Sequence, residues 1–259
     1  MKNISKILSL ALLLGFVSCK KDTKDPDTTP EPTAPTTGSL KIEFENVVDT
    51  AGLQFNSNYV NQKGDTFKVT KFNYFISNIV ITKNDNSTFV EPESYHLVEH
   101  SSPLSSIITL TNVPTGSYKS ITFMLGVDST SNVSGAKTGA FSQNSGMFWS
   151  WSTGYIQFKL EGSSPKSGAT NKSLVYHISG FGGINKPQRN VTFNFSSTTA
   201  NVSTAVTPQI HLQADVLEFF KTPTLIDVTT QYYQMSVNSS SKMFADNYSD
   251  MIRFKHIHN

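Results

Sequence analysis

The sequence has little charge, a single cysteine and no marked excess of either sign of charge. Its 259 residues include 21 lysines and arginines against 19 aspartates and glutamates, so the formal net charge is +2. A protein that binds nucleic acid through its surface charge would show a basic excess or clustered basic residues. A domain held together by disulfides needs at least two cysteines. The composition therefore excludes both classes, and we expect no nucleic-acid partner.

Charged residues make up only 15% of the chain, whereas an average globular domain has about 25%. Hydrophobic residues account for 37% and include 18 phenylalanines, which is enough for a substantial core. We therefore expect one folded domain, in which serine, threonine and asparagine fill the polar positions.

Motifs of common enzyme classes are missing as well. The chain has no Gly-x-Ser-x-Gly elbow, no phosphate-binding glycine loop and no His-Glu-x-x-His helix. The run Gly180-Phe181-Gly182-Gly183 has the wrong spacing for a dinucleotide fingerprint and is typical of a turn. A Ser/His/Asp triad stays open, because its members need not be neighbours in the sequence. No constellation supports an enzyme, and we predict a protein without catalytic activity.

The first 19 residues have the pattern of a secretion signal. Lys2 precedes an apolar run over residues 7–17, which is too short to span a bilayer and stay there. The following Phe16-Val17-Ser18-Cys19 resembles a bacterial lipobox, in which the cysteine is diacylated and becomes the mature N-terminus after cleavage. We predict that residues 1–18 are a lipoprotein signal peptide and that Cys19 is lipidated. The alternative is an unlipidated signal peptide with an incidental cysteine.

Residues 19–38 are predicted to be a tether, because the segment after Cys19 is rich in lysine, aspartate, threonine and proline and cannot bury a core. This leaves one domain at residues 39–259, anchored by lipid in a bacterial cell envelope and facing the periplasm or the outer surface. The net charge of that domain is near +1, which gives no long-range attraction to anionic lipid. Membrane attachment would therefore come from the acyl chains on Cys19.

Short runs of alternating or β-branched apolar residues recur through the domain and predict strands. Turn residues separate them, as in Lys83-Asn84-Asp85-Asn86 and Val113-Pro114-Thr115-Gly116. Helical periodicity is hard to find, apart from short turns at 216–221 and 245–251. We therefore expect an all-β fold, an antiparallel β-sandwich that is immunoglobulin-like or related and has long loops. The expected strands are 40–47, 66–82, 95–98, 107–110, 120–125, 155–160, 174–178, 190–195, 209–219 and 251–258.

Four histidines are candidate metal ligands, since imidazole suits copper, zinc, iron and nickel. His256 and His258 stand two residues apart, so on a strand both rings would project from one face, where they can share a metal. The alternative is that they belong to a frayed polar chain end. His177 and His211 each lie within an apolar run, where a lone histidine is more often a hydrogen-bonded core residue than a ligand.

The two tryptophans are also two residues apart. On an extended segment Trp149 and Trp151 would point the same way, and Tyr155 follows closely. These aromatic residues could pack in the core, form a platform that stacks on sugars, or form a redox-active cluster. A surface module that recognises a glycan or a protein is therefore an alternative to a metal-binding protein.

Several segments resemble the MbnP family and occur in the family's order. The Trp-x-Trp segment that leads to Glu161-Gly162 is the most specific of them, and the resemblance covers essentially all of residues 39–259. The segments are Phe72–Ile79, Leu125–Ser129, Met147–Gly162, Tyr176-His177, Pro208–Leu212 and Ala245–Met251, followed by His256 and His258.

The resemblance implies an exported copper-binding protein. Members of the family are associated with methanobactin or with copper acquisition in methane oxidisers, and occur as lipoproteins in other bacteria. In the characterised type, histidines and a kynurenine hold the copper, and a partner di-haem peroxidase makes the kynurenine by oxidising a tryptophan. By position, Trp149 is the candidate for oxidation, and the candidate ligands are His177, His211, His256 and His258.

The sequence departs from copper-binding relatives at two places. Trp151 stands where such relatives tend to have a histidine two residues after the oxidised tryptophan. The first strand reads Phe44-Glu45-Asn46-Val47, where some relatives carry a histidine. Copper would then be held by the remaining imidazoles, or the domain would keep the fold without the metal.

Overall fold

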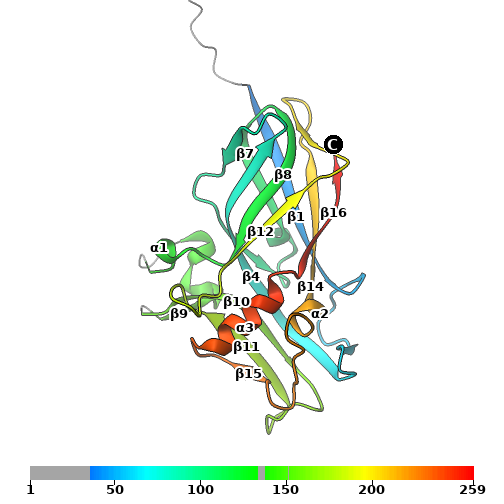
Figure 1. Ribbon diagram of the computed structural model, residues 1–259, viewed down its shortest axis with the longest axis vertical. Coiled ribbons are helices and arrows are strands. Elements are labelled where there is room, and N and C mark those ends of the chain that lie inside the picture. The colour runs from blue at the N-terminus through cyan, green and yellow to red at the C-terminus, as the bar shows by residue number, and fades with distance from the viewer. Residues whose placement is uncertain (1–35, 134–137, 151) are drawn as a thin grey trace, which may run out of the picture. The chain divides into compact units, whose positions relative to one another are not determined.

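The computed structural model describes residues 36–133, 138–150 and 152–259. The predicted signal peptide, Cys19, the tether up to residue 35 and Trp151 lie outside the described residues. The first strand begins at Thr37, two residues before the expected start of the domain. In the described part of the chain, most regular structure is in two β-sheets (Figure 1), and no helix is long and apolar enough to cross a membrane.

The smaller sheet has five strands in the order β16-β14-β1-β2, and β7 also pairs with β1. β14 runs parallel to β1, so that Glu43 lies opposite His211, whereas β16 runs antiparallel to β14 and places His256 opposite His211. The strands are β1 (Thr37–Val48), β2 (Ala51–Gly52), β7 (Ile107–Pro114), β14 (Gln209–Asp215) and β16 (Ile252–His258).

The larger sheet has eleven strands, and its central path follows the order β12-β8-β4-β10-β11-β15. The 18-residue strand β4 is its longest, and it pairs with β3, β5, β6, β8 and β10. The strands are β3 (Tyr59–Val60), β4 (Thr66–Lys83), β5 (Thr88–Val90), β6 (Tyr95–Glu99), β8 (Gly116–Leu125), β9 (Phe148–Ser150), β10 (Gly154–Ser163), β11 (Ser173–Ser179), β12 (Arg189–Asn194), β13 (Ala200–Val202) and β15 (Tyr233–Gln234).

Helices are few and short, and side-chain caps begin the α-helices of the described chain. Asn238 caps α3 by accepting hydrogen bonds from the backbone of Ser240 and Ser241. The helical elements are α1 (Ser129–Asn132), α2 (Val216–Phe219), α3 (Ser239–Tyr248) and the 3₁₀ turns Pro103–Ser106, Gly139–Phe141 and Gln143–Ser145. The short turn expected at 245–251 is therefore the end of a ten-residue helix.

The strand expected over 209–219 is wrong beyond residue 215. β14 ends at Asp215, whose carboxylate accepts a hydrogen bond from the backbone N–H of Leu217 and so caps α2. The apolar run continues into the helix because Val216 and Phe219 are still buried. Buried apolar residues do not by themselves distinguish a strand from a helical turn.

The main core lies between the two sheets. Phe44 of β1 packs edge-on against Phe123 of β8, with ring centroids 5.5 Å apart, and against Tyr74 of β4. Such aromatic contacts, with the aliphatic residues around them, bury a large apolar area, which is the main favourable term in folding. The expected all-β, sandwich-like fold is confirmed. The pairings of β1 with β14 and of β11 with β15 are parallel, so the sheets are mixed and not purely antiparallel.

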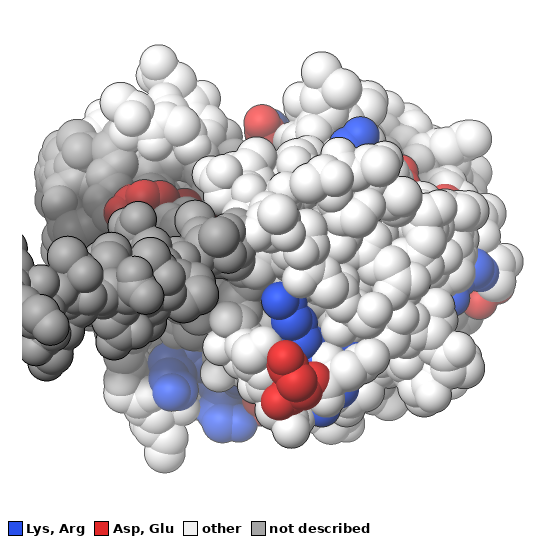
Figure 2. Space-filling model, turned by 90° about the horizontal axis from the view of Figure 1, so that it is seen from above, with Lys and Arg blue, Asp and Glu red and all other residues white. Residues whose placement is uncertain are grey.

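Charged side chains are sparse on the face of the molecule drawn in Figure 2, where they lie singly or close to a charge of opposite sign. This arrangement follows from the low charged fraction of the sequence. The described ion pairs include two between aspartate and arginine, Arg189 with Asp246 and Arg253 with Asp215.

Candidate metal centre

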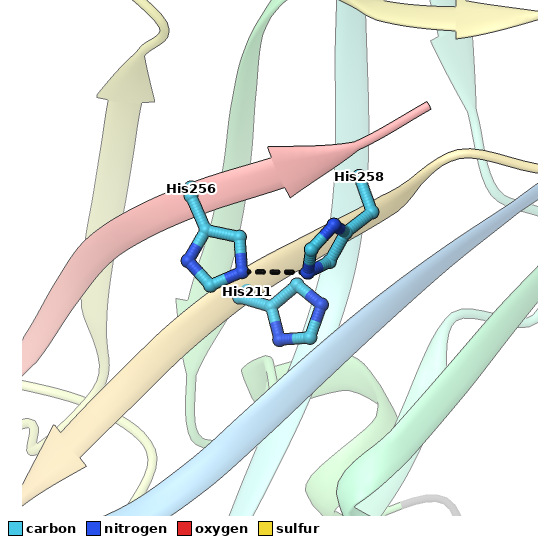
Figure 3. Close-up of side chains that lie close together, drawn as sticks. All are labelled: His211, His256 and His258. Carbon is cyan, nitrogen blue, oxygen red and sulfur yellow. Dashed lines mark hydrogen bonds between the residues drawn. The ribbon is translucent and has the colours of Figure 1, made fainter.

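Three of the four histidines proposed from the sequence meet on the smaller sheet. His211 projects from β14, and His256 and His258 project from β16, with their rings turned toward one another (Figure 3). One ring nitrogen from each residue can be chosen so that all three atoms lie within 4.8 Å of one another. This is close enough for three imidazoles to share one metal ion.

The strand register explains why these rings converge. His211 and His256 are cross-strand partners in the antiparallel pair of β14 and β16, and a register shift follows directly after His211. His258 lies two residues beyond His256 and therefore on the same face of β16. The rings of His211 and His256 stack with centroids 4.4 Å apart, while His258 lies edge-on to both at 4.8 Å and 4.6 Å.

The ring nitrogens of this cluster are unevenly satisfied. The Nε2 atoms of His256 and His258 are 2.9 Å apart, so one donates a hydrogen bond to the other. Nδ1 of His211 lies 2.9 Å from Oε2 of Glu43. Nε2 of His211 is buried and has no hydrogen-bond partner among the described residues. An unsatisfied buried polar atom costs about 1–3 kcal/mol, and a metal ion at this nitrogen would remove that cost.

Burial lowers the pKa of His211, and Glu43 acts in the opposite direction. The neighbouring His256 and His258 lower this pKa further, because two like charges disfavour each other. A lowered pKa keeps the His211 imidazole neutral at physiological pH, which is the form that binds a metal. Three imidazoles without a thiolate suit copper or zinc. The residues present therefore fit a transition metal.

His177 lies elsewhere, on β11 of the larger sheet. Its Nε2 is 2.7 Å from Oε1 of Glu161, and its ring is edge-on to Trp149 with centroids 6.2 Å apart. Burial lowers the pKa of His177, and the hydrogen bond to Glu161 works against that. The structure thus brings His177 together with Trp149 and not with the three clustered histidines.

The aromatic residues near Trp149 are mostly packed inside the protein. Tyr155 is 0% exposed, its ring packs against Phe75 and Phe141, and its hydroxyl donates to the backbone carbonyl of Phe141. Trp149 is half-buried and packs against the same cluster. The ring of Tyr155 is therefore not available for stacking on a sugar, while Trp151 lies outside the described residues.

Glu43 is a residue of this site that sequence reasoning missed. It reaches His211 because β1 and β14 are parallel neighbours, although 168 positions separate the two residues in the chain. No short-range pattern carries that information. The usable signal was its alternation with the buried Ile42 and Phe44, which puts Glu43 on the outer face of the strand.

Comparison with known proteins gives two matches. A family model described as MbnP matches residues 37–241. Among solved structures, MbnP from Methylosinus trichosporium is similar, with a TM-score of 0.51, 14% sequence identity, and coverage of 76% of this chain and 83% of that chain. No curated protein matches the sequence. The family match ends before β16, so it includes His211 but neither His256 nor His258.

Proposed function

This chain belongs to the MbnP family, and on that premise we propose that it is an envelope-anchored lipoprotein that binds copper and serves in copper capture or handling. The observation that carries the proposal is the convergence of three imidazoles, one of which, that of His211, has a buried Nε2 without a hydrogen-bond partner among the described residues. His211, His256 and His258 would hold the metal.

The donor set supports copper among the metals that imidazole binds. Cu(II) stands at the top of the affinity order of divalent first-row metals, so a few well-placed nitrogen donors are selective without a large acidic cluster. Copper bound here would be held and released, and the proposed role is capture or delivery without turnover. The stacked and edge-on arrangement of the rings keeps their nitrogens close to one another before any metal arrives.

Titration of the copper-free protein tests this proposal. At pH 7 we expect Cu(II) to bind and to raise the Tm, because a ligand that binds only the folded state stabilises it by about 2.7 kcal/mol at 100 times its Kd. Affinity should weaken as the pH falls through about 6.5, the ordinary imidazole range, because protonated rings do not bind metal. His211, whose pKa burial lowers, should stay neutral to a lower pH than an exposed histidine.

Calorimetry at several pH values measures both effects, and zinc titrated in parallel shows the selectivity. Absence of Cu(II) binding at pH 7 would refute the proposal. Stabilisation by sugars without any metal would favour the recognition module instead.

Anchoring is tested at Cys19. We expect Cys19→Ser to move the protein from the detergent phase to the aqueous phase in a partition assay, because the acyl chains are the proposed source of membrane affinity. The matched control is Ser18→Ala, which keeps the cysteine and should leave the protein in the detergent phase. A Cys19→Ser protein that still partitions into detergent would show that the anchor lies elsewhere.

Oxidation of Trp149 is the third element of the proposal. Conversion of an indole to kynurenine is a multi-electron oxidation, and the sequence has no Cys-x-x-Cys-His run for haem attachment. We therefore propose a separate di-haem peroxidase as the partner. Protein made alone in a foreign host should keep its indoles, whereas protein from its native envelope should show kynurenine on the peptide that contains Phe148-Trp149-Ser150.

Peptide mass spectrometry and indole fluorescence measure this difference. Unmodified Trp149 in copper-loaded native protein would contradict the oxidation and leave a site made of histidines only. The half-buried position of Trp149 beside His177 predicts that its modification alters the environment of that ring as well.

A further inference from the structure

We propose that Glu43 is a positioning residue for the metal centre, which holds His211 in the tautomer whose bare Nε2 faces the other two histidines. This inference rests on the proposed function for its consequence in metal affinity. Its basis is the contact between Glu43 and His211 in the metal-free protein, whose effect on the ring can be measured on its own.

One hydrogen bond and one close ion-pair contact hold the Glu43 carboxylate. Its Oε2 lies 2.9 Å from Nδ1 of His211 and accepts a hydrogen bond, 2.7 Å long, from the amide of Gln209. Gln209 precedes His211 by two residues on β14 and so lies on the same face of the strand. The carboxylate is thus held from neighbouring positions of one strand.

The charge of Glu43 indicates where the imidazole proton lies. An ionised carboxylate has no proton to donate, so its position 2.9 Å from Nδ1 favours the His211 tautomer with the proton on that nitrogen. A neutral imidazole has one N–H, and Nε2 is therefore left with a free lone pair. That nitrogen is the buried atom that has no hydrogen-bond partner in the described part of the chain, and the rings of His256 and His258 contact its ring. A metal-binding histidine commonly has a carboxylate at its second ring nitrogen.

The next row of residues on the same sheet provides an internal comparison. Glu45, Gln213 and Arg253 are cross-strand partners on β1, β14 and β16, as Glu43, His211 and His256 are in the first row. In the second row the amide of Gln213 donates to Glu45 over 2.7 Å, and Arg253 donates to Gln213 over 3.1 Å.

The second row therefore ends in a permanent cation on β16, and the first row ends in histidines. Among the described residues, no lysine or arginine forms an ion pair with Glu43. A metal ion held by His211 and His256 would place a positive charge in the first row, as Arg253 does in the second, where its guanidinium also pairs with Asp215. The negative charge of Glu43 would then favour the metal-bound state as well as orient the ring.

The matched pair of substitutions is Glu43→Gln and Glu45→Gln. Both remove one carboxylate charge from β1 with little change in shape, and each affected residue has a glutamine donor on β14. Nitrogen-15 NMR of the histidine rings in the metal-free protein reports the tautomer, and competition titration with Cu(II) reports the affinity. Thermal unfolding of both metal-free variants measures any general structural effect.

We expect wild type and Glu45→Gln to show His211 protonated at Nδ1, and Glu43→Gln to lose that preference. Copper affinity of Glu43→Gln should fall by about 10–100-fold, the usual cost of losing a partner of a metal-binding histidine, while Glu45→Gln keeps the wild-type affinity. The two variants should have similar Tm values. A merely structural role would lower the Tm of Glu43→Gln and leave the His211 tautomer unchanged.

Three results would overturn the inference: His211 protonated at Nε2 in metal-free wild type, an unchanged affinity in Glu43→Gln, or an equal loss of affinity in both variants. The first is measured on the wild-type protein and does not depend on whether a variant folds. Failure of wild type to bind copper would refute the proposed function, while the tautomer of His211 would still decide whether Glu43 positions the ring.

Discussion

Replacement of His211, His256 and His258 together by alanine is expected to abolish copper binding and to leave the domain folded. The loss should exceed the about 10–100-fold that follows from removing a supporting partner of a ligand, because all three nitrogen donors disappear. The fold should persist, since His256 and His258 are exposed and His211 is only partly buried. Removal of His211 also removes a buried nitrogen that has no hydrogen-bond partner among the residues that the structure describes.

The matched control is His177→Ala. His177 is also a half-buried strand histidine paired with a glutamate, but it lies beside Trp149 on the other sheet. Competition titration with Cu(II), after circular dichroism has shown that each variant is folded, compares the two. Wild-type affinity in the triple variant together with lost binding in His177→Ala would move the copper site to the Trp149 region.

The largest effect on stability is expected at Phe158. Its ring is 1% exposed and stacks between Phe219 and Tyr248, with centroids 5.1 Å and 4.7 Å away. Phe158→Ala should lower the free energy of unfolding by about 3–5 kcal/mol, the usual range for truncating a buried phenylalanine. Loss of these stacked contacts, which join β10 to α2 and α3, favours the upper part of that range.

Urea denaturation of the metal-free protein measures this loss, and Phe193→Ala is the control. Phe193 is half-buried and has its ring 6.2 Å from that of Phe123, so its truncation should cost clearly less. Equal losses in the two variants would mean that the contacts of Phe158 with the two helices contribute little to stability.

The sequence predicted local features of this fold well and pairings between distant segments poorly. Alternation of apolar residues located the core strands, because one face of each strand must be buried. It also placed His256 and His258 on one face, where the structure has their rings in contact. The parallel pairing of β1 with β14 was not predicted, because the sequence pattern within a strand does not indicate which other strand pairs with it.

The same limit applies to the candidate site. Each histidine was a candidate by residue type, but the sequence could not show that His211 joins the β16 pair while His177 lies beside Trp149. Those groupings depend on which strands are neighbours. The start of α3 at Ser239 was missed for a different reason, since its capping box uses Ser241 in place of the usual glutamate or glutamine.

The parallel pairing of β1 and β14 has a consequence for the order in which the protein folds. It joins residues as far apart in the chain as Glu43 and His211, and contacts of such high sequence separation form slowly, because a long loop must close before they contribute energy. In an unfolded chain the three imidazoles are present but Glu43 is not held beside His211, and a fragment that lacks β1 has no Glu43 at all. Copper bound with the full affinity of the native site would therefore report that the two ends of the domain have come together.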